Sequence, residues 1–518
     1  MPTSARVSGV RRQVAPRPPV RLQSYALVYA LLATFLILAH GPLLRLPFYW
    51  DEIGQFIPAS LDLFRIHALI PVSTVPNVHP PGVMAYLALF WNFFGYSIVA
   101  TRIAMLLVAA AGALITFLLA IELSRGAMGT PAFAALALLC ISPLFFAQAM
   151  LAQLDMPAMC LSLLALLLFL QNRVRASVIA CAVLVLVKET GLIVPAILGA
   201  WTLAEGRNKA EKLRAAWFLF PLPGLLLWLV ALHHATGHWL GNAQFTTYNV
   251  FEPLHPVTFV LALARRIYYL FVGTGHFIGT IAVIWAWRRM PLLRDRPWRI
   301  AGSFVLAQMV AVSALGGAVL ERYLLPALPI VYIAFATSLG ALLPKMRKIA
   351  LGALLACLTA ANFVNPLYPF PFENNLAFAS FVGLEQDAAD AVSLGGLAIP
   401  GGGRVATAFP VANALRNPEF GFVQRAFRVD EVDNFSRSEV EMLKTQAPDF
   451  VVVYRREWDP LGLLNVTAVR NFFMRHYGYE PELSAEEIAS ALSMRVARAW
   501  ERRGLTMQLL ERYPRRSE

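Results

Sequence analysis

The sequence predicts a polytopic α-helical membrane protein that ends in a soluble α/β domain. Of its 518 residues, 58% are hydrophobic and only 14% are charged, and the mean hydropathy is +0.59. Apolar runs near the length of a membrane span recur between residues 25 and 365 and stop before the tail. Soluble domains rarely approach this composition, which is routine for proteins with many membrane spans.

The apolar runs predict about eleven membrane segments. Nine of them lie at 25–44, 98–122, 131–149, 155–170, 214–233, 267–288, 300–319, 323–342 and 348–365. The stretch 176–206 adds two short helices, because "KETG" at 188–191 interrupts it in the middle. The apolar part of 79–95 has only about a dozen residues against the roughly 17 to 25 that a span requires, so we expect an interfacial helix there.

The distribution of positive charge sets the expected orientation. With these segments, 20 of the 27 Lys and Arg in residues 1–369 fall on one side of the membrane, which the positive-inside rule makes the cytoplasmic side. Residues 1–24 then form a basic cytoplasmic tail, and the run from Tyr25 is a retained signal anchor. Residues 25–369 form the membrane domain, with a first external loop at 45–97, and residues 370–518 lie outside. Short loops and the absence of disulfide patterns favour a bacterial inner membrane, with the tail in the periplasm.

The basic excess does not indicate a nucleic-acid-binding protein. Residues 1–369 hold 27 basic against 11 acidic residues, a net charge of +16, whereas residues 370–518 hold 17 against 20, a net charge of −3. Only the membrane part is basic, which points to topology and lipid head groups as partners. The cysteines lie inside apolar runs without metal-ligand spacing and are interpreted as packing residues: Cys140, Cys160, Cys181 and Cys357.

The tail at 370–518 has the pattern of a small α/β domain. "GRVATAF" at 403–409 and "DFVVVY" at 449–454 have the short β-branched and aromatic runs of buried strands. The stretch 484–503 is predicted as a helix that begins at Ser484, with Glu487 three residues later as in a capping box. It contains no fingerprint for a nucleotide or a metal.

Charged residues from distant parts of the sequence collect on the external face of this topology. A charge at the centre of a membrane helix costs about 2.5–3.5 kcal/mol on insertion scales, so such groups persist near span ends only when hydrated, paired or bound to a ligand. We therefore expect one external pocket lined by Asp51, Glu52, His79, Asp155, Lys188, Glu189, Glu321, Arg322 and Tyr323.

Each of these residues also has a simpler explanation. Asp51 and Glu52 could be solvated loop acids, although aromatic residues and prolines surround them. Asp155, followed by Met and Pro, suits the start of a helix, and it could serve as a cap as well as in a site. Lys188 and Glu189 could neutralise one another, and Arg322 could pair with the neighbouring Glu321.

These motifs in this order resemble the glycosyltransferase C superfamily. They are "YWDEIGQF" at 49–56, "HPPG" at 79–82, "QLDMP" at 153–157, "KETG" at 188–191 and "ERYLLPALP" at 321–329. The similarity is strongest to the bacterial branch near the lipid A aminoarabinose transferases and the protein O-mannosyltransferases, and it covers about residues 25–345. Each motif alone is short and unspecific; their order and their common side of the membrane carry the resemblance.

The resemblance implies a membrane glycosyltransferase that uses a polyprenyl-phosphate-linked sugar and acts with inversion. Asp51 matches the family's first-loop acid and would be the base that accepts the proton of an acceptor hydroxyl. Glu52 would orient the acceptor or the base, and Asp155 would be a second acid facing the sugar. Cations favour the departure of the phosphate, and the candidates are Lys188 and Arg322, with Arg265 or Arg266 as an addition. His79, Glu189 and Tyr323 are the remaining candidates for substrate contacts.

The cofactor and the class of function have alternatives. In oligosaccharyltransferase relatives, the acids corresponding to Asp51 and Asp155 hold a divalent ion, but Pro157 stands where a further acid would follow Asp155, so we expect no required metal. The resemblance implies a lipid, protein or glycan acceptor. A transporter or flippase for a lipid-linked sugar is the rival function, although transporters usually have repeated halves and ionisable residues near the bilayer midplane. A non-catalytic scaffold is a third alternative.

Overall fold

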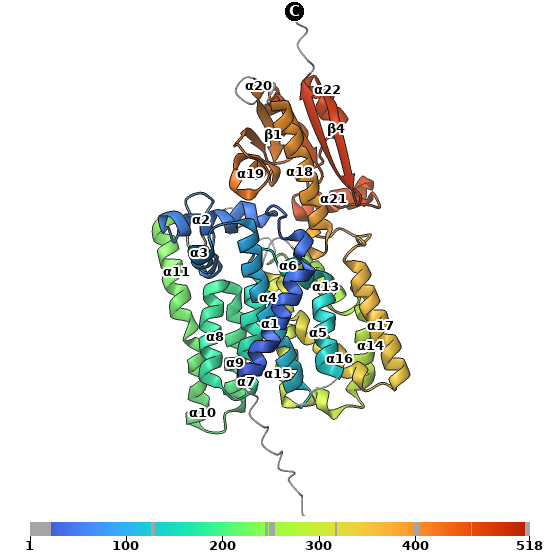
Figure 1. The fold of residues 1–518 in the computed structure, drawn as a ribbon. Coiled ribbons are helices and arrows are strands. Elements are labelled where there is room, and N and C mark those ends of the chain that lie inside the picture. The colour runs from blue at the N-terminus through green and yellow to red at the C-terminus, as the bar shows by residue number, and fades with distance from the viewer. Residues whose placement is uncertain are drawn as a thin grey trace, which may run out of the picture.

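A bundle of helices carries a smaller α/β domain on one of its ends (Figure 1). The structure is a computed structural model that describes residues 22–125, 130–243, 247, 254–315, 319–396, 399, 403–456 and 458–512. The predicted order of a helical part followed by a C-terminal domain with a sheet is confirmed. Of the expected basic tail, residues 1–21 lie outside the described residues.

Proline and capping residues mark the starts of many helices in the bundle. Pro143, Pro221, Pro256 and Pro344 each occupy a first helical position, where the fixed φ fits and no hydrogen-bond donor is lost. The helices are α1 (Leu22–Ala39), α2 (Ile57–Ile66), α3 (Gly82–Phe94), α4 (Ile98–Leu123), α5 (Thr130–Ile141), α6 (Pro143–Gln148), α7 (Asp155–Leu170), α8 (Val174–Val187), α9 (Ile193–Glu205), α10 (Lys209–Leu213), α11 (Pro221–Thr236), α13 (Pro256–Phe271), α14 (His276–Trp287), α15 (Arg296–Ala314), α16 (Leu328–Gly340) and α17 (Pro344–Ala361).

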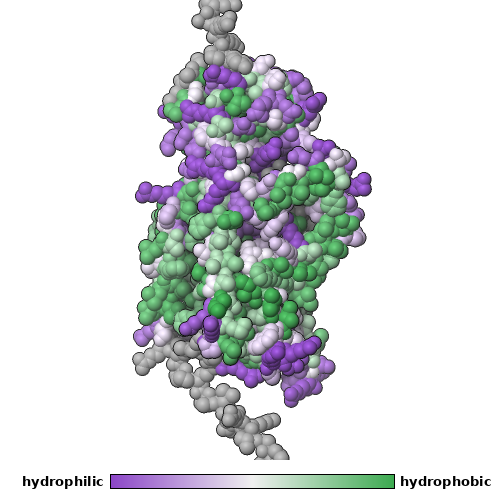
Figure 2. All heavy atoms as spheres, turned by 90° about the vertical axis from the view of Figure 1, so that its right-hand side faces the viewer, coloured by the Kyte–Doolittle hydropathy of each residue, from purple (hydrophilic) through white to green (hydrophobic). Residues whose placement is uncertain are grey.

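The face of the bundle in Figure 2 has a hydrophobic band, with hydrophilic residues at its lower end and on the soluble domain. Within the described residues, three helical stretches are long and apolar enough to cross a membrane: Ile98–Leu123, Lys209–Thr236 and Pro256–Trp287. Other apolar helices have 10–17 residues, among them α7 and α8. The band fits a membrane-embedded bundle, while the number of about eleven segments and their orientation remain predictions.

The break predicted at "KETG" is present and is confirmed as a turn between two helices. Helix α8 ends at Val187, Lys188 is extended with φ −151°, and a short 3-10 turn at Glu189–Leu192 leads into α9. Helix α10, which follows α9, lies at the end of the bundle opposite to the soluble domain (Figure 1). Helix α9 runs between the turn at Lys188 and α10, so these two lie at opposite ends of the bundle (Figure 1). Lys188 itself lies near Asp155.

The loop predicted at 45–97 to be the first external loop contains two short helices next to the soluble domain (Figure 1). Helix α3 has 13 residues, buries Leu87 and Trp91 and exposes Phe93 and Phe94, as expected of a helix that lies at an interface. A π-helical turn at Glu52–Phe56 precedes α2. This region supplies Asp51 to the site described below.

A fully buried ion pair fixes the start of this loop. The Glu52 carboxylate accepts from Arg102 of α4 and from the backbone N–H groups of Tyr49 at 2.8 Å and Ala152 at 2.6 Å. Both side chains are inaccessible to solvent. Arg102 also donates to the carbonyls of Met150 and Pro47, at 3.1 and 3.0 Å. Because Glu52 joins three segments through one carboxylate, it determines where its neighbour Asp51 lies.

The soluble domain is a mixed sheet in the order β2-β1-β3-β5-β4, in which β1 pairs in parallel with β2 and β3, and β5 runs antiparallel to β3 and β4. Both predicted strands are confirmed, as β1 (Arg404–Ala408) and β3 (Phe450–Tyr454). The other strands are β2 (Arg428–Val432), β4 (Met494–Arg502) and β5 (Leu505–Arg512). The helices are α18 (Ala377–Gly396), α19 (Val411–Arg416), α20 (Arg437–Gln446), α21 (Thr467–Tyr477) and α22 (Ala485–Leu492).

The helix predicted over 484–503 is wrong in its second half. Ser484 and Glu487 form the expected capping box, but α22 ends at Leu492, and Ser493 turns the chain at φ 55°. The following residues form β4, because their backbone pairs with β5 on both sides of a register shift between Val496 and Arg498. Tertiary pairing overrides the local helical preference there.

The two parts of the molecule share one hydrophobic core and several hydrogen bonds. The Phe48 N–H donates to the carbonyl of Phe420 at 3.2 Å, and the Tyr96 hydroxyl donates to the carbonyl of Glu419 at 2.6 Å. The Asn413 amide donates to the carbonyl of Ile53 at 3.3 Å. The soluble domain therefore packs on the first external loop rather than hanging from a linker.

The buried pair of Glu52 and Arg102 gives a test of this arrangement. We expect Arg102→Met to lower the free energy of unfolding by about 3–5 kcal/mol, because it leaves a buried carboxylate without its cation. Thermal unfolding of the purified protein in detergent measures the loss. Adding Glu52→Gln to Arg102→Met should recover part of it, since no buried charge then remains; a double variant that is less stable than Arg102→Met would contradict this account.

Candidate active site

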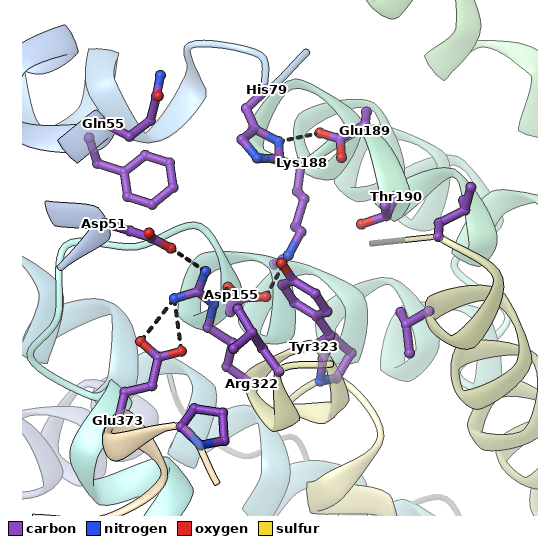
Figure 3. Close-up of a pocket in the computed structure, with 18 of the residues that line it drawn as sticks. Asp51, Gln55, His79, Asp155, Lys188, Glu189, Thr190, Arg322, Tyr323 and Glu373 are labelled. Atoms are coloured by element: carbon purple, nitrogen blue, oxygen red, sulfur yellow. Dashed lines mark hydrogen bonds and ion pairs between the residues drawn. The ribbon is translucent and has the colours of Figure 1, made fainter. Parts of the chain in front are cut away.

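A cavity of about 730 Å³ lies where the helix ends nearest the soluble domain meet the connection to that domain. The predicted residues that line it are Asp51, His79, Asp155, Lys188, Glu189, Arg322 and Tyr323 (Figure 3). They come from five separate segments of the chain. Glu52, Glu321, Arg265 and Arg266 do not line it. Arg456 reaches the cavity wall from the soluble domain.

Arg322 is the central cation of the cavity. It lies in the 3-10 turn Glu321–Leu324 between α15 and α16, with its side chain 6% exposed. Its guanidinium donates to Asp51, faces the Asp155 carboxylate with Nε 3.3 Å from Oδ2, and donates from Nη1 to both oxygens of Glu373 at 2.9 and 3.0 Å. Burial alone would lower the pKa of Arg322, but Glu373 and Asp51 raise it well above its ordinary value. The simpler alternative, a pair between Arg322 and Glu321, is not formed, because Glu321 binds Arg265 and Asn374.

Lys188 is the second cation and pairs with Asp155. Its Nζ donates to Asp155 Oδ1 at 2.5 Å, and both side chains are less than a tenth exposed. The break after α8 allows this contact, because Lys188 is extended and leaves the helix. Asp155 is the first residue of α7 and makes no capping hydrogen bond, although its charge suits a helix N-terminus. The Lys188 ammonium also lies 4.3 Å from the centre of the Tyr323 ring, within cation–π range.

Asp51 is the carboxylate of this group that remains open to the cavity. Its side chain is 31% exposed, compared with 5% for Asp155 and 4% for Glu373. The preceding Trp50 has φ 45°, which is rare for a bulky residue, and its ring packs against Phe381 and Phe409. The aromatic packing of Trp50 and the buried Glu52 thus hold Asp51 from both sides.

Glu373 belongs to the site and was not predicted from the sequence. It lies in the 3-10 turn Phe372–Asn374, within the region assigned to the soluble tail. Besides Arg322, it accepts from the Gln153 amide at 3.3 Å. Burial is the main cause that raises the pKa of Glu373 to about 7; Arg322 opposes it, and Asp51 and Asp155 add to it. The one signal in the sequence is an isolated acid that follows the run "YPFPF" at 368–372.

His79 and Glu189 form a separate pair on the cavity wall. His79 Nδ1 lies 2.8 Å from Glu189 Oε2, and each side chain is 19% exposed. Burial would raise the pKa of Glu189, but His79 and Lys188 outweigh it and lower the pKa to about 2. Glu189 thus stays ionised at physiological pH and orients the imidazole of His79 toward the cavity.

Two expectations about the site need correction. Glu52 faces Arg102 in the protein interior, so it holds the loop in place instead of touching a substrate. Arg265 pairs with Glu321 at 2.5 Å, and Arg266 donates to Ser313 and to the carbonyls of Val312 and Leu320. Both arginines therefore position the turn that carries Arg322 and are not placed to bind a phosphate in the cavity.

The carboxylates of the site are not arranged to hold a divalent metal. Among the described residues, no group of three or more His, Cys, Asp or Glu side chains could hold a metal ion. Asp51 and Asp155 both face the Arg322 guanidinium, which fills the space that a shared ion would need. The residues present therefore do not fit a metal bound between Asp51 and Asp155.

Comparison with known proteins identifies the fold. No protein-family model and no curated protein matches the sequence. The structure of ArnT from Cupriavidus metallidurans bound to undecaprenyl phosphate is 15% identical, with TM-score 0.56, over 95% of this chain and 98% of that chain. Its apo structure is 14% identical, with TM-score 0.54, over 94% and 98%. The chain therefore has the same fold as ArnT.

Another solved structure matches with a lower TM-score. AglB, an archaeal oligosaccharyltransferase from Archaeoglobus fulgidus, is 11% identical, with TM-score 0.48, over 83% of this chain and 69% of that chain. The resemblance stated from the sequence motifs is thus confirmed at the level of fold. Because identities this low establish the fold alone, the activity has to be argued from the residues of the cavity.

Replacing Arg322 tests whether it is the common partner of the carboxylates. We expect Arg322→Gln to lower the free energy of unfolding by about 3–5 kcal/mol at pH 8, because buried carboxylates then face one another. The loss should shrink toward pH 6. An acid whose pKa is higher in the folded than in the unfolded state loses stability as pH rises through the folded value, and Glu373 has such a pKa.

Thermal unfolding in detergent at pH 6, 7 and 8 measures this dependence. Arg416→Gln is the matched control, since Arg416 pairs with Glu431 on the surface of the soluble domain. It should unfold near the wild-type temperature at each pH, because exposed ion pairs contribute little. An Arg322→Gln variant with the same loss at all three pH values would show that Glu373 is not involved.

Proposed function

We propose that the protein is a membrane glycosyltransferase that moves a sugar from a polyprenyl-phosphate-linked donor to an acceptor hydroxyl. The observation that carries this proposal is the adjacency of Asp51 and Arg322 in one cavity: a partly exposed carboxylate lies directly beside a buried guanidinium. The first can accept a proton, and the second can bind a phosphate. The glycosyltransferase C fold supports this class, as ArnT was solved with undecaprenyl phosphate.

The reaction requires a base that accepts a proton and a cation that stabilises a growing negative charge. An acceptor hydroxyl that attacks the anomeric carbon loses its proton as the new bond forms, and Asp51 is the base open to the cavity. The bond from that carbon to the phosphate oxygen breaks, and negative charge grows on the phosphate. Cations aimed at this oxygen stabilise the transition state more than the bound donor, and Arg322 and Lys188 fill this role.

The same arrangement supports inversion at the anomeric carbon. In a direct displacement, the acceptor attacks from the side opposite to the departing phosphate, so one base suffices and no covalent sugar intermediate forms. Asp155 is bound to Lys188 and faces Arg322, which makes it a group that orients the cations. Its low exposure does not favour a role as a nucleophile.

The donor, the acceptor and the location follow from the surroundings of the cavity. The cavity lies at one end of the membrane helices, where the phosphate of a membrane-held lipid can reach Arg322 while its chain stays in the bilayer. We propose that this end faces the periplasm of a bacterial inner membrane, as the positive-inside rule predicts. The sugar is a hexose or pentose, and the acceptor is a lipid, protein or glycan.

Asp51→Asn tests the proposed base. We expect turnover to fall by about 10²–10⁴-fold, because asparagine keeps the shape but accepts no proton. The assay incubates purified protein with a labelled polyprenyl-phosphate sugar and measures the release of polyprenyl phosphate. Asp387→Asn, which alters an ion pair on the surface of the soluble domain, is the control and should keep wild-type turnover.

Unchanged turnover in Asp51→Asn would remove Asp51 from the reaction. Movement of the intact donor across the membrane, without release of polyprenyl phosphate, would assign the protein to the lipid-linked-sugar transporters instead. Binding of the donor should survive in Asp51→Asn, since Arg322 and Lys188 are both retained.

Chelation provides a separate test of the cation in the site. We expect EDTA to leave turnover unchanged, because a guanidinium, and not a metal ion, lies between Asp51 and Asp155. The same release assay, run with EDTA and then with added Mg²⁺ or Mn²⁺, measures the effect. Loss of turnover in EDTA and its recovery with metal would show that Arg322 moves aside for an ion.

A further inference from the structure

The cavity contains more negative than positive charge around its phosphate-binding cations. Arg322 and Lys188 are the two cations of one ion-paired cluster, and Asp51, Asp155 and Glu373 are the three carboxylates paired with them. Arg456, which also reaches the cavity wall, pairs instead with Glu482 at 3.5 Å. With the carboxylates ionised, this cluster has a net charge of −1. A phosphodiester would bring a further negative charge, and in a buried cavity like charges at short distance repel strongly. A donor phosphate can therefore take its place on Arg322 only if one carboxylate withdraws or loses its charge.

Glu373 is the carboxylate best suited to give way. Asp155 is held from two sides, by Lys188 and Arg322, and releasing it would leave Lys188 without a partner. Asp51 lies between the packed Trp50 and the buried Glu52 and is the proposed base. Glu373, by contrast, has both oxygens on one nitrogen of Arg322, and its other side-chain partner is the neutral amide of Gln153.

We propose that Glu373 is an internal competitor of the donor phosphate: it occupies Arg322 in the empty site and, once protonated, yields the guanidinium to the phosphate. This inference rests on the proposed function, because it assigns the phosphate to Arg322. Both oxygens of Glu373 accept from Nη1 of the guanidinium, a donor that a phosphate oxygen would take in their place. Glu373 thus keeps a buried arginine paired between reaction cycles.

The groups around Glu373 couple the binding of phosphate to the protonation of its carboxylate. The charged and titratable groups that face it are Arg322, Asp51, Asp155 and the buried phenol of Tyr49. Burial and the two aspartates raise the pKa of Glu373 to about 7 in spite of Arg322. When a phosphate pairs with Arg322, Glu373 loses the partner that favours its charged form, so it takes up a proton from solvent. The proton is released when the phosphate leaves and Glu373 returns.

The position of Glu373 also links phosphate binding to the soluble domain. Glu373 and Asn374 are consecutive residues of the turn before α18, and they bind consecutive residues of the turn before α16: Arg322 and Glu321. A movement of Glu373 away from Arg322 therefore acts on the start of α18. Asn374 keeps the two turns joined through Glu321 while Glu373 exchanges its partner.

Binding of a phosphodiester lipid at two pH values tests the proposal. The probe is the methyl diester of decaprenyl phosphate, which carries one negative charge throughout this range, and the full-length protein is held in nanodiscs. A carboxyl with a pKa near 7 that must be protonated for binding makes wild-type affinity fall about tenfold from pH 6 to pH 8. Glu373→Gln is neutral at both values and should bind about tenfold more tightly than wild type at pH 8, with little dependence on pH.

Calorimetry of the wild-type protein supplies a readout that needs no variant. Titration at pH 8 in buffers with different heats of ionisation should show the uptake of about one proton for each diester bound. Glu385→Gln is the matched control, because Glu385 is a buried carboxyl of α18 outside the cavity lining and without a hydrogen-bond partner in the structure. It should keep the wild-type affinity and pH dependence.

The outcomes separate this inference from the proposed function. Diester binding without proton uptake, together with an unchanged Glu373→Gln affinity, would overturn the competitor role while leaving the glycosyltransferase intact. No binding of the diester to wild type or to Glu373→Gln at either pH would overturn both. Binding to Glu373→Gln alone at pH 8 would be the strongest support, since the charge of Glu373 would then exclude the phosphate.

Discussion

The structure depends on the placement of one buried guanidinium among three carboxylates. Removing an arginine from water costs several kcal/mol, and this cost is offset only when hydrogen-bonded counter-charges surround it. Asp51, Asp155 and Glu373 come from three segments that no short loop could bring together, and Arg322 is their common partner. The ion pairs of Arg322 therefore hold the walls of the cavity together, whereas the surrounding helices make mainly apolar contacts.

The interactions around this centre form successive supports. Glu52 and Arg102 fix the loop before α2, Arg265 and Arg266 fix the turn before α16, and the extended backbone at Lys188 brings its ammonium to Asp155. None of these supports needs to touch a substrate to matter. Each one restricts the movement of a charged side chain. What such a side chain can bind depends on its position to within a fraction of an ångström.

Sequence reasoning predicted the fold and most of the cavity, and its errors have physical causes. The break at Lys188 was visible because charge inside an apolar run has few explanations, and Asp51 was visible for the same reason. Glu52, Arg265 and Arg266 have the same appearance in the sequence, but partners in distant segments decide which way each of these side chains points. Glu373 was missed because it lies beyond the last span, where an acid is ordinary. The helix after Ser484 was extended too far because the pairing of β4 with β5 is not a local property.

The shared core between the two parts limits how this protein can be divided. Because residues 370–373 line the cavity, and because Phe48, Tyr96 and Ile53 bind the soluble domain through hydrogen bonds, the tail completes the pocket wall. In a chimaera that joins the membrane helices to the tail of a distant homologue, the two parts would not pack correctly at their interface. The sequences of the two parts therefore have to change together. A graft would have to include both the turn at Phe372–Asn374 and the first loop.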